Sequence, residues 1–337
     1  MKFMMPPILK GIDPRHTILP LEVLVDSTLK ENYIVIDADG KIYEPRDEIA
    51  QRIEKHWPAL EEAAKATGLD PATQFFSKGY GLSHVSDLNF VAHGQFIDDA
   101  WETGLEISTQ PMSFKQRMAV LPGARPYSLF GFDAMPKALT GGINLIMTDD
   151  TMPLQLRGEF ALKYVNSLDG TKNPVYHQPA GFYNVNPTEE FPKGKTVSQV
   201  IRAHIVRREL GLMDKRQDEV DELIEKVVHN AIVYNPNLDE VYICSTVELN
   251  KSWKEIVMMQ PEAKRFDYDK AHKMISAKPE ELEQFLRRPR VPLMAYTRAN
   301  IAFHLQEEVG ILVKETYRSA PPLGYNLYLR DAEWRYN

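Results

Sequence analysis

The sequence has few residues suited to disulfides, cysteine metal clusters or membrane spans. Its 337 residues include one cysteine, Cys244, which excludes an intramolecular disulfide and a cysteine metal cluster. Scarce cysteine is typical of a reducing compartment, so we expect a cytoplasmic protein. No segment approaches the ~20 apolar residues of a membrane helix, and Pro6 and Pro7 interrupt the short apolar start. We therefore expect a soluble protein with no secretion signal and no membrane partner.

The chain also lacks an excess of basic residues. Its formal net charge is −7, which provides no positive field for the phosphates of nucleic acids, and general nucleic-acid binding is not expected. We find no internal repeat and no low-complexity tract. A hydrophobic content of 43% and a charged content of 26% are those of an ordinary globular protein,, and the length allows two domains with separate cores.

The first 139 residues predict an α/β region of unknown role. Residues 33–36 and 41–43 read as two strands joined by a turn at Asp39-Gly40,. A helix should follow Pro45, because apolar residues recur there at helical spacing: Ile49, Ile53, Trp57 and Leu60,. Between Phe75 and Gly142 the pattern has no period, which predicts an irregular but packed connector.

Residues 140–312 have a more regular pattern and are predicted to form a second domain. A strand at 142–147, a turn at 148–151 and an antiparallel return at 154–157 are followed by a β-branched strand at 240–248,. Helical spacing predicts five further helices, near 218–229, 251–258, 268–276, 280–286 and 291–308,. Residues 313–337 form an aromatic-rich tail, which we expect to dock on its own domain or on a protein partner.

The most informative segment runs from Thr196 to Leu212. It follows Gln178-Pro-Ala-Gly181 and ends in Arg208-Glu-Leu-Gly-Leu212. Taken as a structural element alone, it predicts an amphipathic helix with a glycine C-cap at Gly211. Its inward face would carry four aliphatic residues: Val197, Val200, Ile201 and Ile205.

This order of strand, turn, strand, Pro-x-Gly turn and helix resembles the core of the Nudix hydrolases, over roughly residues 140–310. The resemblance implies an α/β (α+β) fold with a mixed sheet flanked by helices, preceded here by the additional N-terminal α/β region. In that family the helix presents three carboxylates on one face. They bind Mg²⁺, which neutralises a diphosphate and activates water.

Matching Gly211 and Leu212 to the end of the Nudix motif places its arginine at His204 and its three carboxylates at Ile205, Arg208 and Glu209. Only Glu209 is acidic, and the formal charge of the three sums to zero. An arginine in a metal-binding position repels a divalent cation, so the resemblance implies a non-catalytic protein without a metal or other cofactor.

We expect it to be a binding or protein-interaction module that retains a nucleotide or phosphate pocket. The expected partner is a protein or a nucleotide-like small molecule, and the candidate ligand contacts are Arg157, His177, His204 and Arg208.

Two enzymatic alternatives remain open beside the structural helix and the binding module. One is a Mg²⁺-dependent hydrolase of nucleoside diphosphate derivatives, with Glu209 catalytic and with atypical metal ligands such as Glu189 and Glu190. The other starts from Asp37 and Asp39, since Asp-x-Asp-Gly after an apolar strand is similar to the first motif of the haloacid-dehalogenase phosphatases. That resemblance implies a nucleophilic Asp37 and an acid/base Asp39, whereas an Asp-Gly pair is also a common hairpin turn.

Overall fold

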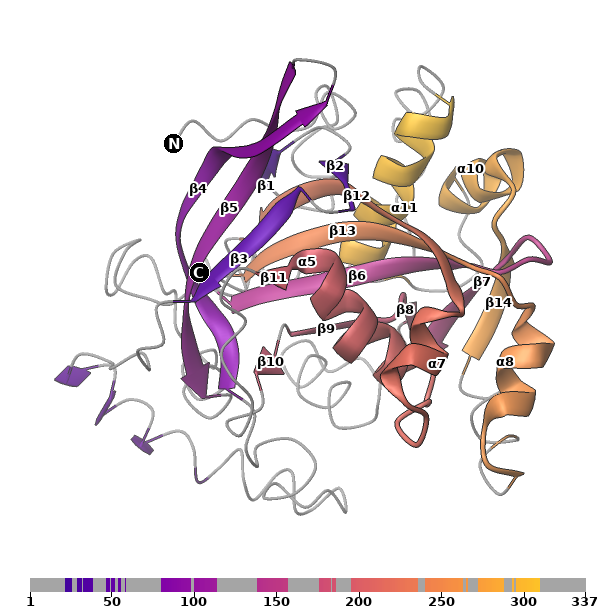
Figure 1. Ribbon diagram of the computed structural model, residues 1–337. Coiled ribbons are helices and arrows are strands. Elements are labelled where there is room, and N and C mark those ends of the chain that lie inside the picture. Colours follow the sequence, from indigo (N-terminus) through magenta and orange to yellow (C-terminus); the bar gives the residue numbers. More distant parts are fainter. Residues whose placement is uncertain are drawn as a thin grey trace.

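The computed structural model describes about half of the chain. The described residues are 22–25, 29–31, 33–38, scattered positions between 47 and 58, 80–97, 100–113, 138–156, 176–182, 184–185, 195–235, 240–262, 265, 272–287, 293 and 295–309. Within them the protein has a mixed α/β structure with three sheets (Figure 1).

The largest sheet has six strands in the order β1-β12-β13-β6-β9, with β2 beside β12. Its centre is formed by β6 (Ala138–Ile146), β12 (Ile224–Asn235) and β13 (Glu240–Leu249). β6 is parallel to β13, and β12 is antiparallel to it. The outer strands are short: β1 (Glu22–Val25), β2 (Leu29–Lys30) and β9 (Ala180–Phe182). The sheet is therefore mixed, as the sequence predicts.

The two smaller sheets also combine distant segments. One has the order β10-β4-β5-β3-β11 and is built on a long hairpin, visible in Figure 1. Its strands are β3 (Ile34–Ala38), β4 (Tyr80–Ile97), β5 (Ala100–Ser113), β10 (Asn184–Val185) and β11 (Lys195–Thr196). The other contains β7 (Thr151–Leu156), β8 (Tyr176–His177) and β14 (His272–Ser276). Two of the sheets combine strands from both sides of residue 140, and the domain boundary at that residue remains a prediction.

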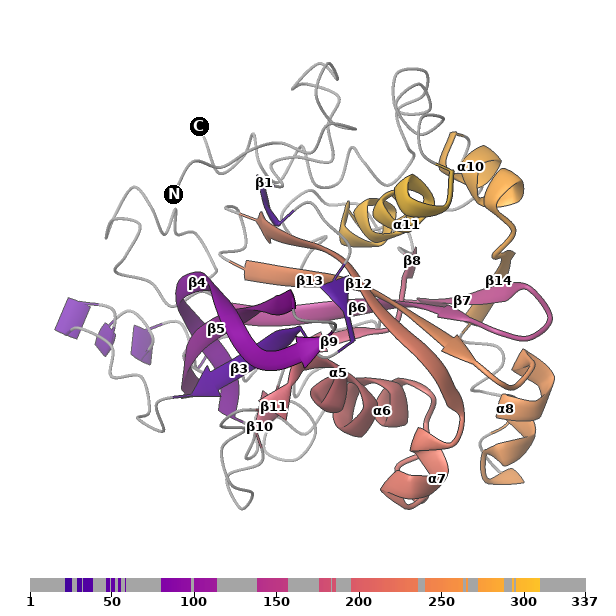
Figure 2. The ribbon, with the colours of Figure 1, turned by 45° about the horizontal axis from the view of Figure 1, so that its top comes forward.

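Helices lie on both faces of the large sheet (Figure 2). One face is covered by α5 (Val197–Val200), η3 (Ile201–Val206), α6 (Arg207–Glu209), α7 (Gln217–Asp221) and α8 (Trp253–Met259). The opposite face is covered by α11 (Ala295–Val309), and α10 (Pro279–Arg287) lies beside α11 and β14. Successive side chains of β13 pack in two separate apolar clusters: Ile243 lies in one and Cys244 in the other. Both faces of the sheet are thus buried.

The interface between α11 and the sheet is polar at its centre. Asn300 donates two hydrogen bonds, to the carbonyl oxygens of Gly142 (3.0 Å) and Ser245 (3.1 Å). It accepts two more, from the side-chain amides of Asn230 (3.2 Å) and Asn144 (3.1 Å). A single buried asparagine therefore joins the helix to β6, β12 and β13. These hydrogen bonds matter because a polar group is costly to bury without a partner.

Several predicted elements are confirmed. The strand predicted at 142–147 is the end of β6, and the strand at 240–248 is β13. The helices predicted near 251–258, 280–286 and 291–308 correspond to α8, α10 and α11. Asp150 closes the predicted turn with a φ of 54°.

The helix predicted near 218–229 is wrong beyond residue 221, because the chain enters β12 at Ile224. β12 pairs with β13 from Ile224 opposite Leu249 to Asn235 opposite Glu240, with a register shift between Ile224 and Lys226. That bulge puts Ile224 and Val227 on one face of the strand, in the same apolar cluster. Because Ile224 and Val227 are three residues apart, their spacing resembles that of one face of a helix, which explains the wrong prediction.

Three other expectations also fail where strands pair with distant segments. Residues 272–276 form β14 rather than a helix, because they pair with β7. The return strand near 154–157 is present as β7, but it pairs with β8 and β14 because β13 and β9 occupy both edges of β6. The predicted irregular connector contains β4 and β5, whose pairing has three register shifts that erase a regular alternation.

Some expectations fall outside the described residues. These include the turn at Asp39-Gly40, the strand at 41–43 and the tail at 313–337. The described residues between 47 and 58 are helical, in agreement with the helix predicted there. None of the helices that the structure describes has the length and apolar character to span a membrane.

Gly142 should tolerate no side chain. A Cβ atom there would lie 1.7 Å from the Tyr242 hydroxyl oxygen and 2.2 Å from Gln178 Nε2. Because overpacking a dense interior costs roughly 1–3 kcal/mol, Gly142→Ala should lower the free energy of unfolding by about that amount in urea denaturation. Adding Tyr242→Phe removes the nearest atom and should restore part of the loss. An unchanged urea midpoint in Gly142→Ala would contradict this packing.

Candidate functional site

The predicted helix between Thr196 and Leu212 is confirmed as one continuous helical segment, residues 197–209, made of α5, η3 and α6. Its start is fixed by a capping box. The Thr196 hydroxyl accepts a hydrogen bond from the Gln199 backbone N–H at 3.3 Å, and Gln199 Oε1 accepts one from the Thr196 N–H at 3.0 Å. Two backbone donors that a helix start leaves open are thereby satisfied.

The inward face of the 197–209 helix is the predicted one. Val197, Ile201 and Ile205 have no exposed surface, and Val200 is 4% exposed. All four pack in the apolar cluster beneath the large sheet. The middle of the helix, η3, is π-helical, and such turns insert one extra residue and are frequent near functional sites.

The predicted glycine C-cap is also confirmed. Gly211 has a φ of 66°, a conformation that glycine adopts without the steric cost that a Cβ imposes. The Gly211 N–H donates to the Arg208 carbonyl at 2.9 Å, and the Leu212 N–H donates to the Arg207 carbonyl at 2.8 Å. These two bonds form the Schellman arrangement.

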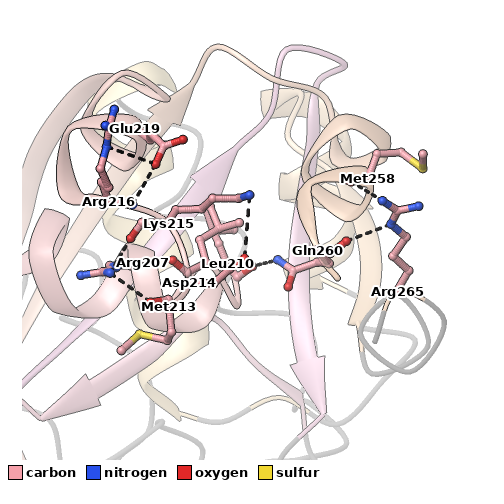
Figure 3. Close-up of polar contacts among 11 residues, drawn as sticks. Arg207, Leu210, Met213, Asp214, Lys215, Arg216, Glu219, Met258, Gln260 and Arg265 are labelled. Atoms are coloured by element: carbon pink, nitrogen blue, oxygen red, sulfur yellow. Dashed lines mark hydrogen bonds and ion pairs between the residues drawn. The ribbon is translucent and has the colours of Figure 1, made fainter. Parts of the chain in front are cut away.

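Side chains from two elements hold this helix end (Figure 3). The Gln260 amide, which follows α8, donates to the Leu210 carbonyl. Arg207 donates to the carbonyls of Met213 (3.0 Å) and Lys215, in the loop after the helix. The end of the helix is therefore a rigid platform for the residues that it carries.

Arg208 and Glu209 form an ion pair on this platform. Arg208 Nε lies 2.9 Å from Glu209 Oε1, with exposed side-chain fractions of 40% for the arginine and 10% for the glutamate. Burial raises the pKa of Glu209 above its ordinary value, and the neighbouring Arg208 charge offsets part of that increase. The pair presents a guanidinium to solvent while its carboxylate is held beneath.

Gly181 lies against the same guanidinium. A Cβ atom on Gly181 would lie 1.9 Å from Arg208 Nη2, so only glycine leaves room for the arginine in this position. Gly181 pairs with Gly141 of β6. The segment Gln178-Pro-Ala-Gly181 and the helix end, which the sequence singles out separately, are therefore neighbours in space.

The remaining predicted site residues are less closely placed. Ile205, matched to the first carboxylate of the helix, is buried in the apolar cluster. His177 is half-buried on β8, and its Nδ1 donates to the Gln178 carbonyl at 2.7 Å. His204 lies on η3 but its side chain is outside the description, and Arg157 is outside the described residues altogether.

The residues proposed for the enzymatic alternatives are mostly outside the description. Asp37 lies on β3 without a described side chain, and Asp39, Glu189 and Glu190 are not described. Across the residues that are described, no group of three or more His, Cys, Asp and Glu side chains is arranged to hold a metal ion. Glu209 is the one proposed catalytic carboxylate with a described environment.

Two further residues shape the site, Gln199 and Gln260, and neither was predicted to do so. Gln199 could have been found from the Thr196-x-x-Gln199 spacing, which is a capping-box signature. Gln260 had no such signal, since it lies 50 residues from Leu210 along the chain. Its role depends on where the fold brings the residue after α8, which no local pattern shows.

Comparison with known proteins adds no family to this geometry. A scan against known protein families finds no match for the chain, and a search of curated proteins finds none either.

The backbone conformation of Gly211 can be tested by comparing two variants. Gly211→Ala and Gly211→Asn would each place a Cβ 2.7 Å from Gln260 Oε1, so both displace the same flexible side chain. A left-handed conformation costs most residues roughly 1–2 kcal/mol, and asparagine less. Urea denaturation should show a larger loss of stability for alanine than for asparagine. Equal losses would mean that the φ of 66° does not contribute.

Proposed function

We propose that this chain is a non-catalytic binding protein that holds a phosphate-bearing small molecule, such as a nucleotide, at Arg208. The observation that carries the proposal is the Arg208–Glu209 pair at the end of the 197–209 helix. The resemblance to the Nudix hydrolases supports the location, because a metal-binding carboxylate would stand where Arg208 stands.

The orientation of Arg208 suits an anion. Its single Nε–H is used by Glu209, so the side chain is held before a ligand arrives. The four N–H groups on the two terminal nitrogens make no hydrogen bond within the described part of the chain. A guanidinium presents such groups as a planar fork that matches two oxygens of a phosphate.

The charges at the helix end favour an anion over a divalent cation. Mg²⁺ in proteins is held by one or two carboxylates together with substrate phosphates and water. Here the available carboxylate, Glu209, already neutralises Arg208, and burial raises its pKa. A metal ion bound to Glu209 would meet the positive charge of Arg208 at close range. A phosphate bound to Arg208 replaces water on an exposed cation.

Binding of pyrophosphate without metal tests the proposal. We expect isothermal titration calorimetry to detect binding to the wild-type chain. Since hydrogen bonds to charged groups contribute roughly 1.5–3 kcal/mol, Arg208→Ala should weaken binding by at least about tenfold. Arg208→Lys should fall between the two, because it keeps the charge and loses the planar fork.

Arg216→Ala is the matched control. Arg216 also pairs with a neighbouring carboxylate, Asp218, at 3.1 Å, and its side chain is 76% exposed. Its removal should leave pyrophosphate binding unchanged. Equal weakening in both variants would indicate nonspecific attraction to surface charge. Absence of binding to the wild-type chain, by pyrophosphate and by nucleotides, would refute the proposal and favour a protein as the partner.

A further inference from the structure

A chain of hydrogen bonds crosses the core beneath the start of the 197–209 helix. His229 of β12 has no exposed surface. Its Nε2 lies 3.0 Å from the Ser198 hydroxyl of α5, and its Nδ1 lies 2.9 Å from the Ser245 hydroxyl of β13. Ser198 in turn donates to the carbonyl of Glu31, in the turn between β2 and β3. Three parts of the chain that are distant in the sequence therefore meet at one imidazole: the turn at Glu31, α5 and the β12–β13 pair.

The hydroxyl hydrogens determine the protonation state of this imidazole. Ser198 has one hydroxyl hydrogen, which it gives to the Glu31 carbonyl, so it can only accept from His229. Nε2 therefore carries the hydrogen of the neutral ring, and Nδ1 accepts from Ser245. The donors run in one direction, from Ser245 through His229 and Ser198 to Glu31. A second hydrogen on Nδ1 would oppose the Ser245 hydroxyl and break this order.

Among the residues that the structure describes, no unpaired carboxylate lies beside the ring to stabilise its protonated form. The described charged groups beside it are the Glu31 carboxylate and Arg202 of η3, which pair with each other at 2.6 Å. The ring's other neighbours along the chain are two neutral hydroxyls. Burial lowers the pKa of His229 to about 4, and the nearby Glu31 carbonyl offsets only part of this effect.

Hydrogen bonds and an ion pair hold the turn at Glu31. Its carbonyl accepts from Ser198 and its carboxylate pairs with Arg202. The adjoining strand β2 contributes two residue pairs with β12, one of which is Leu29 opposite His229 itself. On the other side, β3 pairs with β11, which contains the helix cap Thr196. Release of the turn would therefore affect the start of the 197–209 helix.

We infer that His229 makes the turn at Glu31 a proton-sensitive joint, which opens to solvent when the imidazole takes up a proton. The closed joint favours the neutral ring, and the open joint hydrates either form. Acid therefore favours the open joint without unfolding the whole sheet. The inference is independent of the ligand proposed for Arg208.

The direction of the pH dependence follows from linkage. An open joint binds a proton near the ordinary histidine pKa of 6.5, and the closed joint does so only near 4. Between these two values the open state holds one more proton than the closed state. The opening equilibrium should therefore rise about tenfold for each pH unit below 6.5 and level off near 4.

Hydrogen exchange of the full chain tests the joint. Amide exchange in residues 29–36, corrected for its intrinsic pH dependence, should show this tenfold rise per unit between pH 6.5 and 5. The amides of α8, which lies away from the joint, should show no such rise. His229→Gln, which stays neutral, should remove the pH dependence. Glu31→Gln should raise exchange at every pH, because it breaks the pair with Arg202, and should keep the same slope.

Three results would overturn the inference. The first is a pH slope that persists in His229→Gln, and the second is a slope that disappears in Glu31→Gln, which would assign it to the carboxylate. The third is equal acceleration of residues 29–36 and α8, which would mean general acid unfolding. If His229→Gln fails to fold, NMR titration of the His229 ring in the wild-type chain decides, since a pKa near 6.5 would contradict the buried neutral state.

Discussion

The burial of both faces of the β12–β13–β6 sheet is the constraint on which the rest of the structure depends. Where such a strand is covered on both sides, a polar side chain is removed from water and needs a hydrogen-bond partner. On one side Asn300 of α11 accepts hydrogen bonds from the side-chain amides of Asn144 and Asn230. On the other, Ser198 of α5 satisfies His229. Polar pairing thereby fixes where each covering helix lies.

The 197–209 helix shows how this constraint leads to a candidate site. Its aliphatic face is fully used in the core, its start is held by Thr196 and Gln199, and its end is held by Gly211 and Gln260. Among its described side chains the exposed ones are Gln199, which caps the start, and Arg208, which lies at the end. Because the helix is fixed at both ends, the guanidinium is placed with low loss of side-chain freedom on binding, which favours affinity.

Much of the fold follows from local sequence patterns. The 197–209 helix, its glycine cap, β13 and α11 all have periodicities or end signals that act within one segment. Failures occur where a distant partner decides the structure. Bulges in β12 gave it a helical spacing, and β14 is a strand because β7 lies beside it. β4 and β5 have no visible alternation because their register shifts three times.

The candidate site was likewise predictable only where it depends on residues close together in the sequence. Arg208 and Glu209 are adjacent, so their pairing could be inferred from the sequence alone. The contact of Arg208 with Gly181 depends on the pairing of β9 with β6, which no local pattern shows. The Ser198–His229–Ser245 chain likewise depends on the stacking of α5 over two strands. Interactions between residues far apart in the sequence could be identified only from the structure.

We propose that the charge pair at Arg208 and Glu209 binds phosphate without catalysing its transfer. The most direct test of this proposal is turnover of a panel of nucleoside diphosphate derivatives with Mg²⁺, comparing the wild-type chain with Glu209→Gln. We expect no release of phosphate or nucleotide above background from either protein. Mg²⁺-dependent release by the wild-type chain that is lost in Glu209→Gln would contradict the proposal and establish a hydrolase.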